Sequence, residues 1–228
     1  MRSSRLTSAT NWRYAFGEIT LIVIGVSLAL AASSWYEMAK DNRQGKAILV
    51  DLRETLRADL ENLKAYEKAT IRRANNLSSL IEHLDMAHSY SPQLKEYFKS
   101  LNSWDDVDVR SAPFEALKNR GLNLISSDEL RNLLISLYED EYPALDRSSL
   151  NAQIFVVSKS LPYFLENFAR DKERNWVPED YDAIVDDNYL MNLASWRENT
   201  TQNFLLPRCA AAINRIGEIL AMIDSELE

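Results

Sequence analysis

The chain has 228 residues and a formal net charge of −8, from 26 basic and 34 acidic side chains. This acidic balance argues against nucleic acid as a partner, because phosphate binding needs a basic surface. The single cysteine, Cys209, excludes an internal disulfide, and only five glycines in the whole chain favour long helices over sheets, whose turns use glycine. We therefore expect an all-α protein.

A long uncharged run follows a short leader. Residues 1–14 are polar and basic and too few to form a domain. Residues 15–36 read AFGEITLIVIGVSLALAASSWY, and the 18 positions between Glu18 and Glu37 carry no charge. At a helical rise of about 1.5 Å per residue these positions span about 27 Å, close to the hydrocarbon thickness of a bilayer.

Aromatic side chains flank this apolar run on both sides, as they do at the two interfaces of a bilayer. They are Trp12 and Tyr14 before the run and Trp35 and Tyr36 at its end. Residues 15–36 are therefore predicted to be a transmembrane helix. A cleavable signal peptide is the alternative, since Ala29-Leu30-Ala31 resembles a processing site, but the apolar run continues beyond it and so favours an uncleaved anchor.

The orientation of the span does not follow from counting charges, because basic residues occur on both sides of it. A short basic leader before the first apolar segment is the usual arrangement of a signal anchor, and long domains cross the membrane largely regardless of charge. We therefore expect the N-terminus in the cytoplasm and the rest of the chain on the other side of the membrane.

Small residues recur every fourth position within the span, at Gly25, Ala29 and Ser33. Such a face lets two helices approach closely, so it predicts self-association or contact with other membrane proteins; a chance match among common membrane residues is the alternative. Glu18 allows two interpretations as well. It is either an interfacial carboxylate at a helix N-terminus or a polar contact with another membrane subunit.

Residues 37–46 are expected to join the anchor to a helical domain at 47–228, with Gly45 as the joint or as part of one continuous helix. From Gly45 to His88 the sequence shows a heptad pattern, interrupted by Asp59 and Arg73. The apolar stripe is wide, which favours a helical bundle within one chain over a two-stranded coiled coil. One heptad position holds Leu49, Leu56, Leu63, Thr70, Leu77 and Leu84, and the other holds Leu52, Tyr66 and Leu80.

Shorter helices should follow, with prolines setting their limits. Pro143 should end a helix near Tyr142, because a proline disfavours helical geometry in the residue before it. Pro162 should bend the next helix near Ser158, and Pro207 should interrupt the last one. A loop is expected at 175–188. The predicted helices cover residues 91–101, 111–121, 126–142, 144–172, 189–198 and 200–227, the third opened by a capping box of Ser126 and Glu129.

The chain resembles a family of bacterial single-pass membrane proteins to which no activity is assigned. The resemblance rests on the anchor GEITLIVIGVSLALAASSWYE, the segment SAPFEALKNRGLNLISSDELRNLLISLYEDEY and the closing IGEILAMIDSELE, in this order. It implies a bacterial inner membrane, with residues 47–228 in the periplasm. Phe114 stands where the family usually has tyrosine, which suggests packing rather than chemistry. The central block contains Phe114, Leu117, Gly121, Leu124, Ile125, Leu130, Arg131 and Tyr138.

No residue pattern in the sequence predicts catalysis, a cofactor or a metal. His83 and His88 are five residues apart and so do not share a helix face as a zinc pair would. Acidic clusters at 105–108, 139–141 and 179–182 lack the glycine-containing loop of an EF-hand. Cys209, in an alanine-rich segment, is interpreted as a buried and unreactive thiol. We expect no enzyme, no cofactor and no metal.

Three functional hypotheses follow. The first is an accessory or scaffold subunit that binds other membrane proteins through its anchor and its helical domain. The second is an extracytoplasmic sensory or small-molecule-binding module, with the ligand near aromatic residues. The third is an enzyme with an unrecognised site. The aromatic residues of the second hypothesis are Trp104, Tyr163, Trp176 and Trp196.

Overall fold

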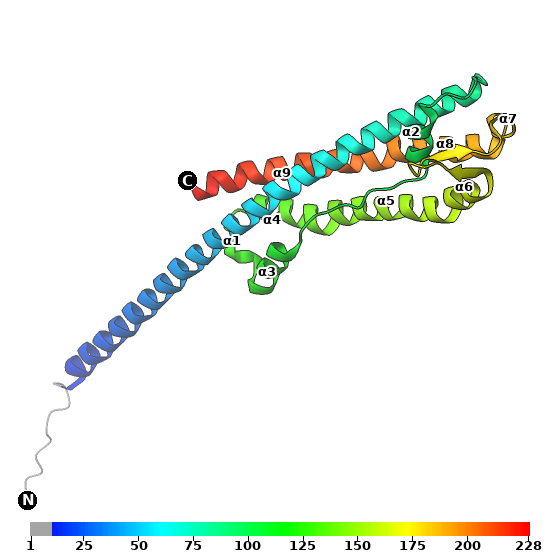
Figure 1. Ribbon diagram of the computed structural model, residues 1–228. Coiled ribbons are helices and arrows are strands. Elements are labelled where there is room, and N and C mark those ends of the chain that lie inside the picture. The colour runs from blue at the N-terminus through cyan, green and yellow to red at the C-terminus, as the bar shows by residue number, and fades with distance from the viewer. Residues whose placement is uncertain (1–10) are drawn as a thin grey trace, which may run out of the picture. The chain divides into compact units, whose positions relative to one another are not determined.

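Helices make up most of the chain (Figure 1). The computed structural model describes residues 11–228, so most of the leader expected at 1–14 lies outside the described residues. The all-α expectation is confirmed, apart from a hairpin of two three-residue strands. The elements are α1 (Asn11–Asp85), α2 (Leu94–Leu101), α3 (Ala112–Arg120), the 3₁₀ helix η1 (Leu122–Leu124), α4 (Asp128–Ile135), the π helix η2 (Ser136–Glu141), α5 (Tyr142–Phe155), the π helix η3 (Val156–Ser160), α6 (Leu161–Asn167), β1 (Phe168–Arg170), β2 (Trp176–Pro178), α7 (Tyr181–Val185), α8 (Asn188–Thr200), the π helix η4 (Thr201–Leu205) and α9 (Leu206–Leu227).

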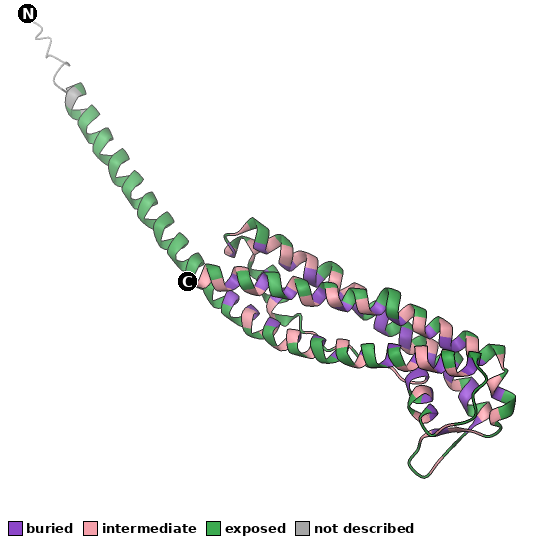
Figure 2. Cartoon of the chain, turned by 90° about the horizontal axis from the view of Figure 1, so that it is seen from above, coloured by how far each residue is buried: buried purple, intermediate pink, exposed green. Residues whose placement is uncertain are grey.

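The chain divides into two compact units between Ala47 and Ile48. In the first unit the helix exposes its apolar side chains (Figure 2); Ile19 and Leu21, for example, are 60% and 75% exposed. This part of α1 is long and apolar enough to cross a membrane, judged by length and composition. Residues 37–46, the expected joint, are helical and lie inside α1. A hinge at Gly45 stays a prediction.

In the second unit three long helical segments lie side by side (Figure 1). They are the part of α1 that begins at Ile48, the run from α4 to α6, and the run from α8 to α9. The leucines of the heptad pattern are buried on α1, and so is Thr70, which is fully buried despite its hydroxyl. The heptad pattern therefore correctly predicted which face of α1 packs against the other segments.

Three prolines in the long helical runs each follow a π-helical turn. Pro143, Pro162 and Pro207 lie two residues after the ends of η2, η3 and η4. A proline lacks the amide proton and its ring crowds the carbonyl four residues back, and the wider π turn accommodates both effects. The Tyr142 N–H accordingly donates to the carbonyl of Leu137, five residues back.

The expected helix end near Tyr142 is therefore wrong, because the π turn carries the helix through Pro143 into α5. The interruptions expected at Pro162 and Pro207 take the form of η3, which includes Ser158, and η4. The capping prediction was one residue off: Ser127 rather than Ser126 caps α4, since its hydroxyl accepts a bond from the Leu130 N–H at 3.1 Å.

The helix predicted over 144–172 ends earlier, at Asn167, where Phe168 turns to extended geometry. Packing explains this difference, because the Phe168 ring stacks on Phe164 with centroids 4.3 Å apart and meets Phe98 edge-on at 4.8 Å. The loop predicted at 175–188 is likewise only partly a loop, since it contains β2 and the short helix α7.

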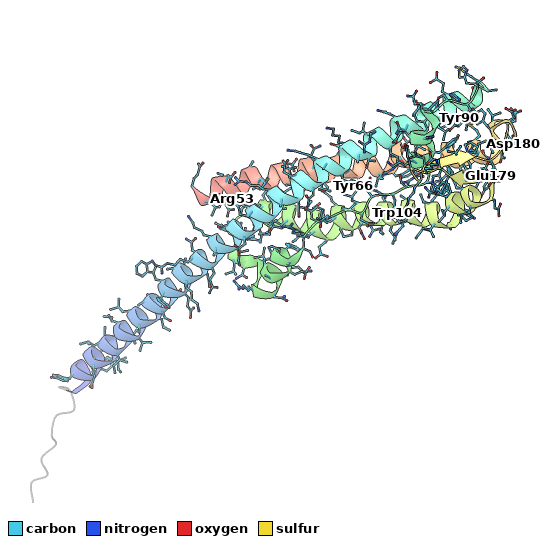
Figure 3. All side chains as sticks on the ribbon, viewed as in Figure 1. Arg53, Tyr66, Tyr90, Trp104, Glu179 and Asp180 are labelled. Carbon is cyan, nitrogen blue, oxygen red and sulfur yellow. The ribbon has the colours of Figure 1, made fainter. Side chains whose placement is uncertain are left out.

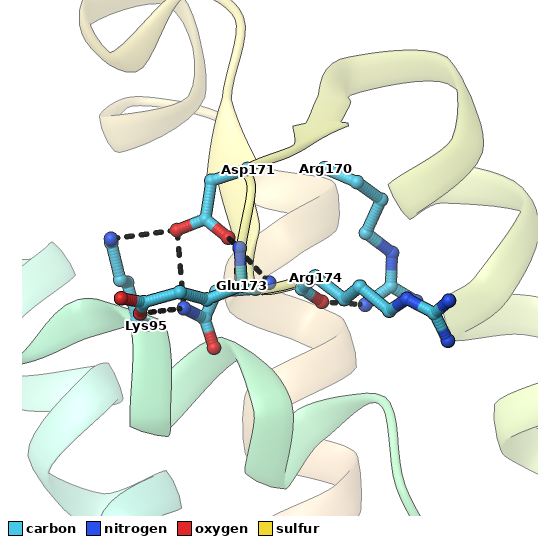
Figure 4. A network of polar contacts seen from close by, with 6 residues as sticks. Lys95, Arg170, Asp171, Glu173 and Arg174 are labelled. Carbon is cyan, nitrogen blue, oxygen red and sulfur yellow. Dashed lines mark hydrogen bonds and ion pairs between the residues drawn. The ribbon is translucent and has the colours of Figure 1, made fainter.

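The hairpin turn between β1 and β2 is held by Asp171 (Figure 4). Its carboxylate accepts bonds from the backbone N–H groups of Glu173 at 2.9 Å and Asn175 at 2.8 Å, and from the Lys95 ammonium of α2 at 2.8 Å. The bond from Lys95, followed by those from Asn175, lowers the pKa of Asp171. The turn is thus attached to α2 as well as closed on itself.

Two hydrophobic clusters form the core of the second unit. The first cluster is aliphatic in the main and joins α1 from Ile48 to Tyr66 with α3, α4, α5 and α9. The second cluster is rich in aromatic rings and joins α1 from Leu77 to Leu84 with α2, α6, the hairpin, α7 and α8. Members of the first include Leu52, Leu56, Leu134, Ile216 and Ile219, and members of the second include Leu80, Phe98, Phe164, Phe168 and Trp176.

Candidate functional site

Polar side chains occupy the interior between the two clusters. We call this set the polar layer: Thr70 and Arg73 of α1, Ser149 of α5, Arg197 of α8 and Thr201 of η4, all buried. Tyr66, labelled in Figure 3 in the C-terminal half of α1, is the last residue of this helix in the first cluster, and Leu77 is its first residue in the second. A polar layer in the middle of a core marks a place where the sequence gives up apolar burial, which is often a functional site.

The polar layer contains two arginines, and they have different partners. Arg73 pairs with Asp105, whose carboxylate lies 2.5 Å from the guanidinium. Arg197 is 1% exposed, and its Nη2 donates to the backbone carbonyl of Ser103 at 3.1 Å, while its Nε has no partner. No carboxylate within the described part of the chain forms an ion pair with Arg197. Its charge is therefore buried without a counter-charge in contact with it.

Burial changes the pKa of the Arg197 guanidinium. Desolvation, together with the nearby charge of Arg73, lowers the pKa of Arg197 to about 10. The group remains protonated at neutral pH, so the layer holds a positive charge in a poorly solvated place. Such a charge destabilises the folded chain unless an anion compensates it.

An open groove lies beside this layer, between α5–η3 on one side and α8–η4–α9 on the other. Its volume is about 490 Å³. The rings of Phe155 and Trp196 stack across it with centroids 4.1 Å apart. Ile154 and Phe204 flank these rings and are 52% and 51% exposed, although both are apolar. The groove therefore presents apolar surface that the fold itself does not cover.

The charged residues of the groove are all basic. Lys159, Arg197 and Arg208 line it, and neither Asp nor Glu does so among residues 11–228. Lys159 and Arg208 are exposed, and Arg208 donates to the Ser148 hydroxyl and, at 3.4 Å, to the Ala144 carbonyl. In a chain with a net charge of −8, this is a locally positive surface.

A second hollow of about 330 Å³, on the other side of the layer, has a different character. Its lining combines basic Arg72, Arg73 and Lys99 with acidic Glu96 and Asp105. Because the two carboxylates offset most of the positive charge of this hollow, we take the groove, which has no acidic lining residue, as the candidate site.

The residues predicted to mediate membrane contacts all lie on α1. Gly25, Ala29, Ser33 and Glu18 are exposed, and a Cβ placed on Gly25 would meet no atom within 4 Å. The face they form therefore has no partner among the described residues. The interface aromatics Trp12, Tyr14, Trp35 and Tyr36 are between 70% and 83% exposed.

The aromatic residues of the ligand-binding hypothesis separate into two groups. Tyr163 and Trp176 are buried in the second cluster and do not line the groove. Trp104 lies on the connection after α2 (Figure 3), and Trp196 lines the groove. Of the four, only Trp196 belongs to the candidate site.

Other candidate chemistries have local explanations. The His83 ring hydrogen-bonds the Tyr181 hydroxyl at 3.0 Å and meets the His88 ring edge-on at 5.3 Å. No three of the His, Cys, Asp and Glu side chains described here gather as metal ligands would. Cys209 is buried as expected, and desolvation raises the pKa of its thiol to about 12.

Neither the protein-family models, nor the curated proteins, nor the solved structures contain a match to this chain.

The sequence analysis singled out one residue of the polar layer. Asp59 and Arg73 interrupt the heptad pattern, and Arg73 belongs to the layer. Arg197 and the groove were missed, because Arg197 lies in a segment without a clear apolar period, and nothing in its sequence neighbourhood indicates burial. Its contact with Ser103 joins positions 94 residues apart.

Proposed function

We propose that this protein is a single-pass protein of a bacterial inner membrane, with its leader in the cytoplasm and a helical-bundle domain in the periplasm. In this proposal it acts as an accessory or scaffold subunit that binds other membrane proteins. One observation supports it most directly: the apolar side chains of residues 15–36 that the structure describes are exposed. Water is a poor solvent for such a surface, and a bilayer is a good one.

The membrane contact of the proposal is the face of Gly25, Ala29 and Ser33, with Glu18 at the N-terminal end of the span. Small side chains let a second helix approach closely, and van der Waals packing then replaces contacts with lipid. Because a Cβ added at Gly25 would have open space around it, we expect a substitution there to leave the fold intact and to affect contacts with partners.

Gentle detergent extraction through a tag at Glu228, followed by sizing and mass spectrometry, tests the accessory role. We expect a defined complex larger than the chain itself. Gly25→Leu should weaken this association about tenfold, whereas Ala31→Leu, on the opposite face of the same helix, should not. An unchanged complex with Gly25→Leu, in detergent and in membranes alike, would refute the proposed face, and a lone monomer would refute the accessory role.

Orientation is tested separately by adding protease to intact spheroplasts. We expect the tag at Glu228 to be cleaved from outside, because the proposal places the C-terminal domain in the periplasm. Protection of the tag until the membrane is permeabilised would reverse the orientation. This result would leave the association experiment valid, since that experiment does not depend on the side of the membrane.

A further inference from the structure

We propose that the groove between α5–η3 and α8–η4–α9 binds a single-chain amphiphile with an anionic head group, such as a free fatty carboxylate. This site lies outside the membrane contact described above, and it does not depend on the accessory role. Three features carry the inference: the shape of the groove, its exposed apolar residues and the sign of its charges.

The size and shape of the groove suit a small ligand. Its volume of about 490 Å³ lies within the range of roughly 300–1,000 Å³ typical of small-molecule sites. The stacked pair of Phe155 and Trp196 forms a rigid apolar surface, because their contact joins α5 to α8. A stable protein partner would need a contact area of roughly 1,000 Å² or more, which is far larger than this groove offers.

The apolar residues of the groove favour a hydrocarbon chain. Ile154, Trp196 and Phe204 each leave about half of their surface in water, and they come from three separate elements, α5, α8 and η4. A flexible acyl chain laid along the groove would contact all three and remove their apolar surface from water. A compact polar ligand would leave this surface exposed.

The charges of the groove favour an anionic head group. Lys159 and Arg208 are exposed at its edges, and Arg197 is buried beneath it without a carboxylate partner anywhere in residues 11–228. An anionic head group in the groove would pair with one of the two exposed cations and interact favourably with the field of the buried one, which water screens weakly. A neutral amphiphile would gain no such electrostatic attraction, and the basic side chains would repel a cationic one.

The test uses the full chain in nanodiscs of zwitterionic lipid, with fluorotryptophan at its five tryptophan positions. A Trp196→Phe variant identifies the fluorine resonance of residue 196. Three probes with the same hydrocarbon chain are then titrated: decanoate, decanol and decyltrimethylammonium. We expect a saturable shift of the Trp196 resonance with decanoate, at least about tenfold weaker binding of decanol, and no shift with the cationic probe.

The double variant Lys159→Gln, Arg208→Gln should weaken decanoate binding about tenfold, since both exposed cations of the groove are then removed. Lys172→Gln, an exposed cation on the hairpin turn, is the matched control and should bind decanoate normally. Equal responses to the three probes, or none that saturates, would overturn the proposal. Displacement of decanoate by an acidic amphipathic peptide at lower concentration would overturn it too, and would make the groove a protein-docking surface.

Discussion

The two clusters of the helical domain are built on different physical principles. The first cluster uses aliphatic side chains that recur along long helices, so each turn of α1 and α9 adds a similar layer. The second cluster uses rings from short elements: Phe164 stacks on Phe168 at 4.3 Å and meets Trp176 edge-on at 5.3 Å. A few large side chains in fixed geometry therefore stabilise the second cluster, whereas repeated contacts along long helices stabilise the first.

The largest expected effect is the loss of a ring from the second cluster. Phe164→Ala should lower the free energy of unfolding by about 4 kcal/mol, because Phe164 is fully buried and contacts four other rings. Leu165→Ala is the matched control, since Leu165 is 68% exposed, and it should change stability by less than about 0.5 kcal/mol. Denaturant unfolding of the full chain in micelles, followed by tryptophan fluorescence, measures both.

Amide hydrogen exchange tests whether the two clusters unfold separately. If the polar layer separates them energetically, Phe164→Ala should speed amide exchange in residues 77–84 of α1 far more than in residues 48–66. Equal acceleration in both segments would mean that the two clusters unfold as one cooperative unit. The difference in their construction would then have no energetic counterpart.

The difference in construction between the two clusters also explains which parts of the fold the sequence predicts. The heptad positions Leu56 and Leu63 correctly predicted the buried face of α1, because a long period averages over local effects. The strand at Phe168 was missed, because its geometry depends on rings from elements far away in the chain. The helix through Pro143 was missed as well, since a π turn has no recognised sequence signal.

For the candidate site, the sequence indicates where a polar residue interrupts the apolar face of α1, but it does not predict the groove. Arg73 interrupts the heptad pattern of α1, but the groove is lined by residues such as Arg197 and Trp196 of α8 and Phe204 of η4. These residues come together only when the run from α8 to α9 packs beside α5. The roles of the membrane residues Gly25, Ala29 and Ser33 stay predictions, because the face they form meets no other described residue of this chain.

The next largest effect is expected in the polar layer, where a substitution should raise the free energy of unfolding rather than lower it. Arg197→Met should raise the free energy of unfolding by about 2 kcal/mol, because it removes a buried charge without a carboxylate partner and keeps an apolar side chain of similar length. Arg73→Met is the matched comparison and should lower stability, since it leaves Asp105 without its partner. Denaturant unfolding at neutral pH and low salt measures both.

A merely structural Arg197 would give another result. If the bond to Ser103 outweighs the cost of burial, Arg197→Met and Arg73→Met will both destabilise the chain. If Arg197 is retained for an anion, Arg197→Met should gain stability and lose decanoate binding together. This combination of gain and loss is typical of functional sites, where stability is given up for binding.

The smallest expected effect lies inside the first cluster, at its buried carboxylate. Asp59 is fully buried and accepts bonds from the Tyr142 hydroxyl at 3.0 Å and the Arg110 N–H at 3.3 Å, while its Oδ1 has no partner. Desolvation raises the pKa of Asp59 above its usual value of 3.8, and these two bonds only partly oppose the shift. The folded chain therefore holds this proton more tightly than the unfolded chain does.

It follows that Asp59 costs stability as pH rises from about 4 through its folded-state pKa, and that the full cost is present above that pKa. Asp59→Asn keeps an acceptor for Tyr142 and removes the charge, so it should raise the free energy of unfolding by about 1 kcal/mol at neutral pH. The gain should shrink as pH falls and vanish below pH 3.8, where Asp59 is protonated in both states. Asp51→Asn, an exposed acid on the same helix, should show no such pH dependence. Destabilisation by Asp59→Asn at neutral pH would mean that the charged form is the one this cluster requires, and that even the aliphatic cluster depends on one ion.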